Sequence, residues 1–202
     1  MTVGLHTNCT AFEGARRIAT GELAEVALKA KAVTDKGEQV LIFDDATSEA
    51  IEVDFRGTAN DVLQRLARLG GSQGASLPDT PRGPGRPRLG VVAREVTLLP
   101  RHWEWLSAQP GGASVALRKL VEEARRANAG KDRVRQSQEA TYRFMSAMAG
   151  NREGFEEATR ALFAGRRERF EQLIGAWPRD IRDHVRKLAV ATFHDPATQT
   201  GS

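Results

Sequence analysis

Residues 70–90, GGSQGASLPDTPRGPGRPRLG, constrain the fold of this chain more than any other stretch. The tract consists almost wholly of Gly, Pro, Ser and Arg, so it cannot bury enough apolar surface to fold by itself. It therefore predicts a flexible linker over residues 71–90, with separate folded segments before and after it.

The segment before the linker, residues 1–70, predicts a small α/β domain. We expect a short strand at Thr10–Glu13 and a helix over residues 21–33, where apolar residues recur at helical spacing. Strands at residues 40–45 and 50–55 are joined by a short polar link, which predicts a β-hairpin. A second helix follows Thr58, a residue type that caps helix N-termini.

The segment after the linker, residues 91–128, predicts a strand followed by two helices. Residues 91–99 have strand composition, and Pro100 suits the first position of a short helix. Pro110-Gly-Gly ends that helix, and Ser114 is the expected N-cap of the second one.

The remainder of the chain predicts a helical domain over residues 129–193. Apolar residues recur there at i, i+3, i+4 and i+7, with breaks at Gly150, at Gly165 and at Trp177–Pro178. We expect residues 194–202 to be a disordered tail. The fold class predicted for the whole chain is therefore α+β.

Charge is distributed unevenly along the chain. Residues 1–70 hold 8 Lys/Arg and 11 Asp/Glu, a net charge of −3, whereas residues 71–202 hold 22 and 15, a net charge of +7. A basic part beside an acidic one is typical of a protein whose basic part faces a polyanion. The same numbers also fit an ordinary solvated surface, and both interpretations stay open.

The sequence favours a reducing compartment. Cys9 is the one cysteine in the chain, so no disulfide can form within it. No apolar run approaches the roughly 20 residues that span a bilayer, and the first residues lack the pattern of a secretory signal. We expect a cytoplasmic bacterial protein with no membrane contact.

The search for catalytic chemistry is negative. The four histidines share no metal-ligand spacing, and the chain holds no P-loop, no GxGxxG and no GxSxG. Asp44-Asp45 is a tight acidic pair, but carboxylates that enter a hairpin turn more often cap the turn than bind metal. We predict no enzymatic activity, no catalytic residue, no metal and no cofactor.

The arginines of the linker resemble a degenerate AT-hook. That motif has the core Arg-Gly-Arg-Pro, and Pro84-Gly-Arg-Pro matches three of the four positions. Extended arginines between glycine and proline fit the narrow minor groove of A·T-rich DNA. The resemblance implies that Arg82, Arg86 and Arg88 contact DNA; the alternative is a solvated linker whose arginines only aid solubility.

Residues 91–125 resemble a ribbon-helix-helix unit. In that family two chains pair their strands into a ribbon that enters the major groove, and the second helix points its N-terminus at a phosphate. The resemblance implies a homodimer on double-stranded DNA, with Ser114 at the phosphate and Arg118 and Lys119 at the backbone. The alternative is a strand and helical hairpin used only for dimerisation or for a core.

The register of the expected ribbon is not determined by the sequence. If Leu99 faces the core, Glu95 and Thr97 share its side, and Arg94, Val96 and Leu98 face the DNA. In this case the face toward the DNA holds one residue with good hydrogen-bonding groups, Arg94. Arg94 and Thr97 are the candidate reading residues.

Most of residues 10–190 resemble an uncharacterised bacterial family, domain of unknown function twenty-two thirty-nine. The phrases that carry the resemblance are Leu41-Ile-Phe-Asp-Asp, Gly85-Arg-Pro-Arg-Leu-Gly-Val-Val, Glu95-Val-Thr-Leu-Leu-Pro-Arg-His-Trp-Glu-Trp-Leu, Gly112-Ala-Ser-Val-Ala-Leu-Arg-Lys-Leu-Val-Glu-Glu-Ala-Arg, Tyr142-Arg-Phe-Met-Ser-Ala-Met-Ala-Gly and Phe155-Glu-Glu-Ala-Thr-Arg-Ala-Leu-Phe-Ala-Gly. It implies no activity, but it implies that the segments belong together in one protein.

Two functions are consistent with the sequence. The first is a DNA-binding protein of the transcription-regulator or nucleoid-associated type. The second is a protein-interaction or oligomerisation module without DNA binding. The arginine charges at positions 82, 86 and 88 discriminate between them, because a pure oligomer does not depend on those charges. An unidentified protein partner for the N-terminal domain stays open in both cases.

Overall fold

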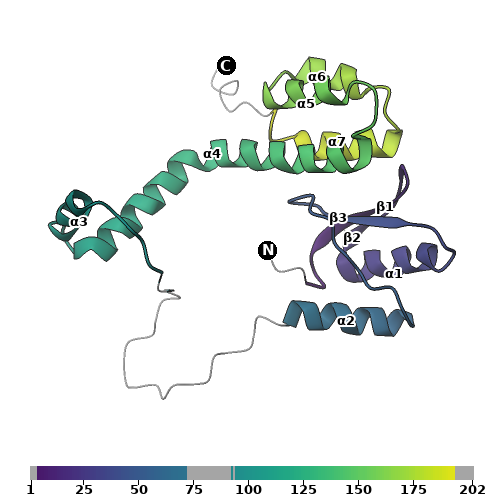
Figure 1. Ribbon diagram of the computed structural model, residues 1–202, viewed down its shortest axis with the longest axis horizontal. Helices are drawn as coiled ribbons and strands as arrows, with labels where there is room; N and C mark the ends of the chain where they lie inside the picture. Colours follow the sequence, from purple (N-terminus) through teal and green to yellow (C-terminus); the bar gives the residue numbers. More distant parts are fainter. Residues whose placement is uncertain (1–3, 72–91, 93, 194–202) are drawn as a thin grey trace, which may run out of the picture. The chain divides into compact units, whose positions relative to one another are not determined.

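The computed structural model describes residues 4–71, 92 and 94–193 (Figure 1). The linker and the C-terminal tail expected at residues 71–90 and 194–202 lie outside this range, apart from Gly71. The chain forms two compact units. One comprises Met1–Ala75 with Asp132–Ser202, and the other comprises Ser76–Lys131.

A three-stranded antiparallel sheet lies at the centre of the first unit. Its strands are β1 (Asn8–Glu13), β2 (Arg16–Glu22) and β3 (Val40–Asp44), in the order β2-β1-β3. The prediction for β1 and β3 is confirmed. β2 was missed because its sequence, RRIATGE, carries little strand signal, and the hairpin depends instead on Gly14, which adopts the left-handed backbone conformation (φ +52°) in the turn.

Helices α1 (Leu23–Thr34) and α2 (Ala59–Gly71) lie on one face of this sheet. Cys9, Ala11 and Ile42 project from the strands into a cluster with residues of both helices. The expected start of α2 is confirmed, since the Asp61 backbone N–H donates to the Thr58 hydroxyl (3.3 Å) and the Thr58 N–H donates back to the Asp61 carboxylate (2.8 Å).

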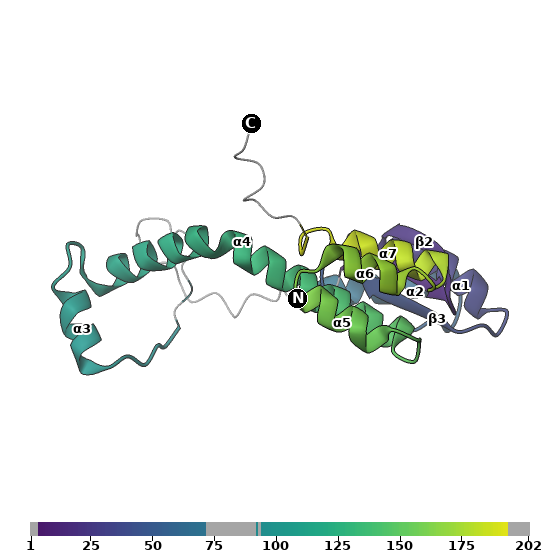
Figure 2. The same ribbon diagram turned by 90° about the horizontal axis from the view of Figure 1, so that it is seen from above.

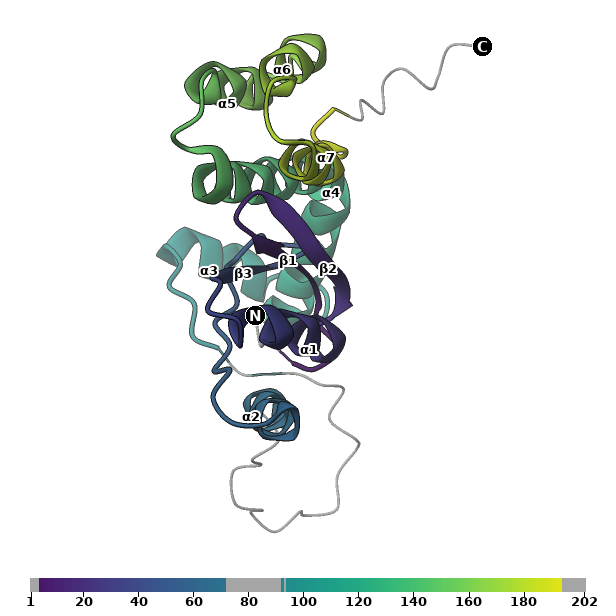
Figure 3. The same ribbon diagram turned by 90° about the vertical axis from the view of Figure 1, so that its right-hand side faces the viewer.

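The opposite face of the sheet packs on the C-terminal helices. These are the second half of α4 (Gly112–Ala149), with α5 (Phe155–Phe163), α6 (Arg167–Ile174) and α7 (Arg179–Ala189). Phe12 and Phe43 meet Phe144 of α4 at ring-centroid distances of 5.3 and 5.1 Å. Figures 1 and 3 show the sheet as a middle layer between α1 and the α4–α7 pair, with α5 and α6 outermost.

The domains that the sequence predicts therefore differ from the compact units that the structure forms. Residues 1–70 and 129–193 were expected as separate domains, yet most of both segments share one compact unit and one hydrophobic core. A strand that is apolar on both faces needs two covering layers, and the chain supplies the second layer only after residue 131.

The strand expected at residues 50–55 is wrong beyond Ala50. The Asp44 carboxylate accepts hydrogen bonds from the Ala46 and Thr47 backbone N–H groups, so it caps the turn as predicted. Pairing with β3 is then limited to one bridge, at Phe43 and Ala50. Beyond this bridge the segment contacts α1, where the Lys31 ammonium group donates to the Phe55 carbonyl at 3.1 Å.

The second unit contains α3 (Pro100–Ser107) and the first half of α4, preceded by residues 94–99. Figure 2 shows these residues as an extended run that leads into α3. The break expected near residue 129 is absent, because α4 continues as one helix of 38 residues. Ion pairs such as Arg125–Glu122 and Arg135–Asp132 support this polar stretch, which tolerates Gly130.

Candidate nucleic-acid interface

The predicted DNA-contacting residues fall in two groups. Arg82, Arg86 and Arg88 lie outside the described residues. The other five are all exposed and all belong to the second unit: Arg94 and Thr97 precede α3, while Ser114, Arg118 and Lys119 lie in the first turns of α4.

Residues 94–99 form no strand in the single chain. They enter α3 at Leu99, whose backbone is extended (φ −66°, ψ 150°) and whose carbonyl accepts a hydrogen bond from the His102 N–H at 2.8 Å. A ribbon needs a second chain to pair with, so the expected ribbon stays a prediction.

The sequence left the register of this segment open. The case in which Leu99 faces the core does not describe the single chain, because Leu99 is 50% exposed. Leu98 is partly buried instead and lines an apolar hollow of about 290 Å³. The other lining residues come from α3 and α4 and are His102, Trp105, Leu106, Leu117 and Leu120. Leu99 is the N-cap of α3, and its neighbour Leu98 is the residue that reaches the hollow.

The helical hairpin has almost no core of its own. Among described residues 94–131, only Leu106 and Ala116 are buried. Trp105 is 53% exposed, although a large aromatic ring is usually buried on folding. A second hollow of about 190 Å³ lies against the same tryptophan, lined by Trp105, Gln109, Pro110, Ala116, Lys119, Leu120 and Glu123.

The start of α4 differs from the prediction. The helix begins at Gly112, so Ser114 lies inside the first turn and is not the N-cap. Gly111 and Gly112 both have positive φ (+86° and +74°), which explains why the turn uses two glycines. A side chain at Gly111 would also meet Val115 at 3.1 Å.

Basic side chains dominate this unit. Residues 94–131 hold seven Lys/Arg and four Asp/Glu, a net charge of +3. Within the described part of the chain, Arg94, Arg101 and Lys119 form no ion pair. Arg118 donates to the Ser114 carbonyl at 3.1 Å and has no acidic partner there. These cations are therefore available to an anionic ligand.

The apolar hollows are the features that sequence reasoning missed. The signal was present in Trp103-Glu-Trp105-Leu106, which places two indoles and a leucine in a helix of eight residues. One face of so short a helix cannot bury all three, so part of this surface remains uncovered.

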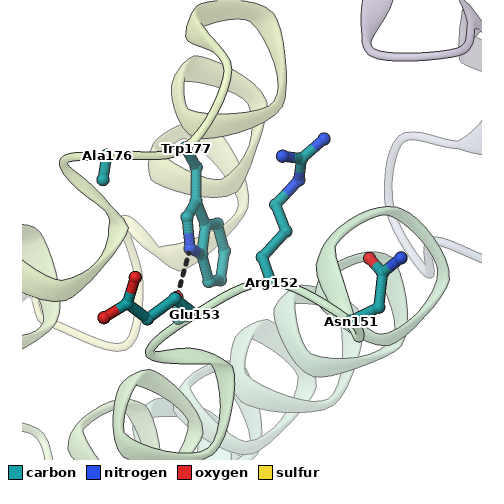
Figure 4. A pocket seen from close by; sticks show the side chains of 5 residues that line it. All are labelled: Asn151, Arg152, Glu153, Ala176 and Trp177. Atoms are coloured by element: carbon teal, nitrogen blue, oxygen red, sulfur yellow. Dashed lines mark hydrogen bonds between the residues drawn. The ribbon is translucent and has the colours of Figure 1, made fainter.

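The first unit contains a hollow of a different kind, shown in Figure 4. It measures about 320 Å³ and is lined by Asn151, Arg152, Glu153, Ala176 and Trp177. The Trp177 indole N–H donates to the Glu153 carbonyl at 3.1 Å, which fixes the ring. The hollow presents one cation and one carboxylate, so its charge selects neither anions nor cations.

The buried titratable groups of the first unit are structural. His184 is fully buried against the rings of Phe12 and Phe144, and burial lowers its pKa to about 4. Burial, together with the nearby carboxylates of Asp45 and Asp44, raises the pKa of the Cys9 thiol to about 12, so this thiol is unreactive. No three metal-ligating side chains come together within the described residues.

No helix in the described ranges is both long enough and apolar enough to span a bilayer.

Comparison with known proteins identifies one match. The profile of a family described as an uncharacterized protein conserved in bacteria, DUF2239, matches residues 8–189. No curated protein and no solved structure matches the chain. The profile covers both units and the helix that runs from one into the other. The chain therefore belongs to this bacterial family.

Proposed function

We propose that this protein binds double-stranded DNA, as a transcription regulator or a nucleoid-associated protein of the bacterial cytoplasm. It acts as a homodimer through residues 91–125. The observation that carries the proposal is the second unit itself: cations without acidic partners surround a helical hairpin whose core is incomplete in one chain.

Phosphate contacts supply most of the affinity in such a complex. Arg118 and Lys119 are exposed side by side on α4 and meet the DNA backbone. Ser114 and the N–H groups that follow Gly112 in the first turn of α4 add a phosphate site, since a helix N-terminus attracts anions. Arg82, Arg86 and Arg88 reach the minor groove or the backbone from the tract that precedes residues 91–125 in the sequence.

The second candidate function is an interaction module without DNA binding. The exposed apolar side chains of α3 and α4 favour it, because such surfaces mark protein contacts. The two functions differ in whether the basic charges matter, and a binding experiment separates them.

The test is fluorescence anisotropy of the full chain with A·T-rich and G·C-rich duplexes over a salt series. DNA binding predicts an affinity that falls steeply with salt. An Arg118→Ala/Lys119→Ala variant and an Arg82→Ala/Arg86→Ala/Arg88→Ala variant each weaken binding. Each also reduces the salt slope, because fewer DNA phosphates are neutralised by the protein.

A matched control removes the same charge from the first unit. Lys29 and Lys36 are exposed and have no ion pair within the described residues, so a Lys29→Ala/Lys36→Ala variant leaves binding unchanged. Absence of binding to every duplex at low salt contradicts the proposal and leaves the interaction module. Loss of an A·T preference in the triple variant identifies the hook-like segment as a minor-groove contact.

A further inference from the structure

We propose that the open edge of β3 binds an extended segment of a partner protein, in which aliphatic residues alternate with lysine or arginine. The site is a groove between β3 and residues 51–55, which follow the bridge of Phe43 with Ala50. All of its lining residues belong to the first unit. The inference therefore goes beyond DNA binding by the second unit and does not depend on it.

β3 is an edge strand, because the strand order is β2-β1-β3. Directly after it, the Asp45 N–H donates to the Asn8 carbonyl on the β1 side at 3.0 Å. Antiparallel strands bond through alternate residues, so the backbone groups of residues 40, 42 and 44 point away from β1. The outer side of β3 is therefore the place where a further strand can pair.

This outer side is occupied over only part of its length. The Asp44 N–H donates to the Glu49 carbonyl at 3.0 Å, and the Ile42 carbonyl accepts from the Ile51 N–H at 2.8 Å. The Ile42 N–H and both backbone groups of Val40 have no hydrogen-bond partner within the described residues. An added strand satisfies these groups, which is how extended peptides bind to sheet edges in other proteins.

A groove of about 480 Å³ lies against the open part of the edge. Val53 and Phe55 line it and pack on the apolar cluster beneath α1 and α2. Leu41 also lines it and is 40% exposed. Successive side chains of an extended segment point to opposite sides. Aliphatic side chains on one side can therefore contact Val53 and Phe55, while the methylene stems of lysines on the other side cover Leu41.

The charge of the groove favours a basic occupant. Its lining includes two carboxylates, Glu38 and Glu52, and no basic side chain. Both glutamates are exposed, and neither forms an ion pair within the described residues. The nearby Asp54 differs, because it is already paired with Arg56 at 2.7 Å. Opposite charges across such a contact contribute mainly to the choice of partner and to the rate of association.

The same charge disfavours a second copy of β3 as the occupant. Pairing of two such edges brings the Glu38 and Glu52 carboxylates of both copies together, and like charges placed opposite each other destabilise strand pairing. The arginine tract at residues 81–87 has the opposite charge, but it contains Pro81, Pro84 and Pro87, which have no N–H to donate. A basic segment without proline, supplied by another protein, fits the groove best.

The test is fluorescence anisotropy of the full chain with the fluorescein-labelled peptide KVKVTVK, in which valine alternates with polar residues. We expect saturable binding. The peptide EVEVTVE reverses the charges. The peptide KVKPPVK removes two adjacent N–H groups, one of which faces β3 in any register. Each of these two peptides is expected to bind about tenfold more weakly or worse.

A charge swap on the protein tests the groove itself. Glu38→Lys/Glu52→Lys is expected to lower the affinity for KVKVTVK about tenfold and to raise the affinity for EVEVTVE. Glu25→Lys/Glu168→Lys is the matched control. Both of these glutamates are exposed on the first unit and have no ion pair within the described residues, so this variant binds KVKVTVK as the wild type does.

Amide hydrogen exchange followed by NMR locates the bound peptide. Saturation with KVKVTVK is expected to slow exchange at the N–H groups of Val40 and Ile42. Absence of saturable binding, equal affinity for EVEVTVE, or protection away from β3 overturns the inference. If Arg88→Glu/Arg94→Glu binds the peptide more tightly than the wild type, the occupant is this chain's own basic run at residues 88–94 and the assignment to a partner is wrong. Duplex binding is measured separately, and its failure leaves this inference unchanged.

Discussion

His184 is a single buried residue that makes the stability of this fold depend on pH. Both ring nitrogens lack a hydrogen-bond partner within the described residues, and the ring packs 4.4 Å from Phe144 between centroids. The nearby Asp45 carboxylate opposes the lowering of the pKa, while Lys187 and Arg17 add to it, but desolvation dominates. The neutral imidazole is therefore a packing element whose protonation is incompatible with its site.

We predict that acid destabilises the first unit through His184. The folded-state pKa is about 4 and the ordinary value is 6.5, so the unfolded chain binds the proton more tightly. The contribution of neutral His184 to the free energy of unfolding is complete above pH 6.5. It is lost as the pH drops toward 4, and the total loss is on the order of 3 kcal/mol. Urea unfolding at pH 7.5 and pH 4.5 measures the difference. His184→Phe removes most of it, whereas the exposed His6→Ala control keeps it; an unchanged difference in His184→Phe contradicts the assignment.

Asp45 is a second single residue with a large effect, because it joins the sheet to α7. Its carboxylate accepts from the Thr10 hydroxyl and from the Lys187 ammonium group, both at 2.6 Å, and its side chain is 15% exposed. Sequence reasoning assigned both aspartates of the Asp44-Asp45 pair to turn chemistry. Only Asp44 has that role.

We predict that Asp45→Ala lowers the free energy of unfolding by about 2 kcal/mol, since it leaves the buried Thr10 hydroxyl poorly paired and removes a shielded ion pair. Glu156→Ala breaks the exposed Arg160–Glu156 pair, whose side chains are 71% and 76% exposed, and costs less than about 0.5 kcal/mol. Denaturant titration of both variants makes the comparison. Equal losses would show that the Asp45 network contributes no more than a surface pair.

At the scale of elements, the hairpin of α3 and α4 differs from every other helical pair in the described chain. α5, α6 and α7 each bury apolar residues in the shared core, whereas α3 buries only Leu106. Helices gain most of their stability in proteins from packing. α3 therefore gains less stability from packing than the other helices of the described chain.

We predict that Leu120→Glu converts the proposed dimer to monomer. Leu120 is 44% exposed in the single chain, so the substitution costs little within one copy and is expected to act on the proposed contact between copies. Val190→Glu is the matched control, because Val190 is 58% exposed on the first unit and plays no part in the hairpin. Sedimentation equilibrium measures the mass of each variant in solution. A monomeric wild type, or a Leu120→Glu variant that remains dimeric, contradicts pairing through this surface.

At the scale of the whole molecule, the chain leaves its first unit and later returns to it. Residues 4–71 build one layer of helices and the sheet, and residues 132–193 cover the other face with α4 and α7. The hydrogen bond from the Arg17 N–H to the Asp180 carboxylate (2.9 Å) joins residues that lie 163 positions apart. Because both pieces share one core, we expect the unit to fold only when both are present.

We predict that residues 1–75 alone do not unfold cooperatively. Without α4 and α7 the fragment exposes Phe12 and Phe43, both of which are buried in the full chain. Thermal melts followed by circular dichroism test this, with the full chain as control. A sharp cooperative transition in the fragment would restore the independent N-terminal domain that the sequence suggested.

Local features of the sequence determined most of the elements. Thr58 and Asp61 specify the start of α2, Pro100 that of α3, and the apolar spacing around Phe170 and Ile174 that of α6. These signals act over a few residues, because caps and helical periodicity are properties of neighbouring side chains. The same reasoning identified the basic surface of the second unit, since charge is read directly from composition.

Only the tertiary structure decided how the elements combine. Leu98 lines an apolar hollow together with Leu106 and Leu117, a contact that side-chain alternation within residues 94–99 does not predict. The periodicity of residues 40–55 fitted a hairpin, but contacts with Lys31 and Arg65 from distant helices drew the second strand away. The return of α4 and α7 onto the sheet likewise joined two predicted domains into one. Each of these outcomes depends on contacts between residues far apart in the chain, which local spacing does not encode.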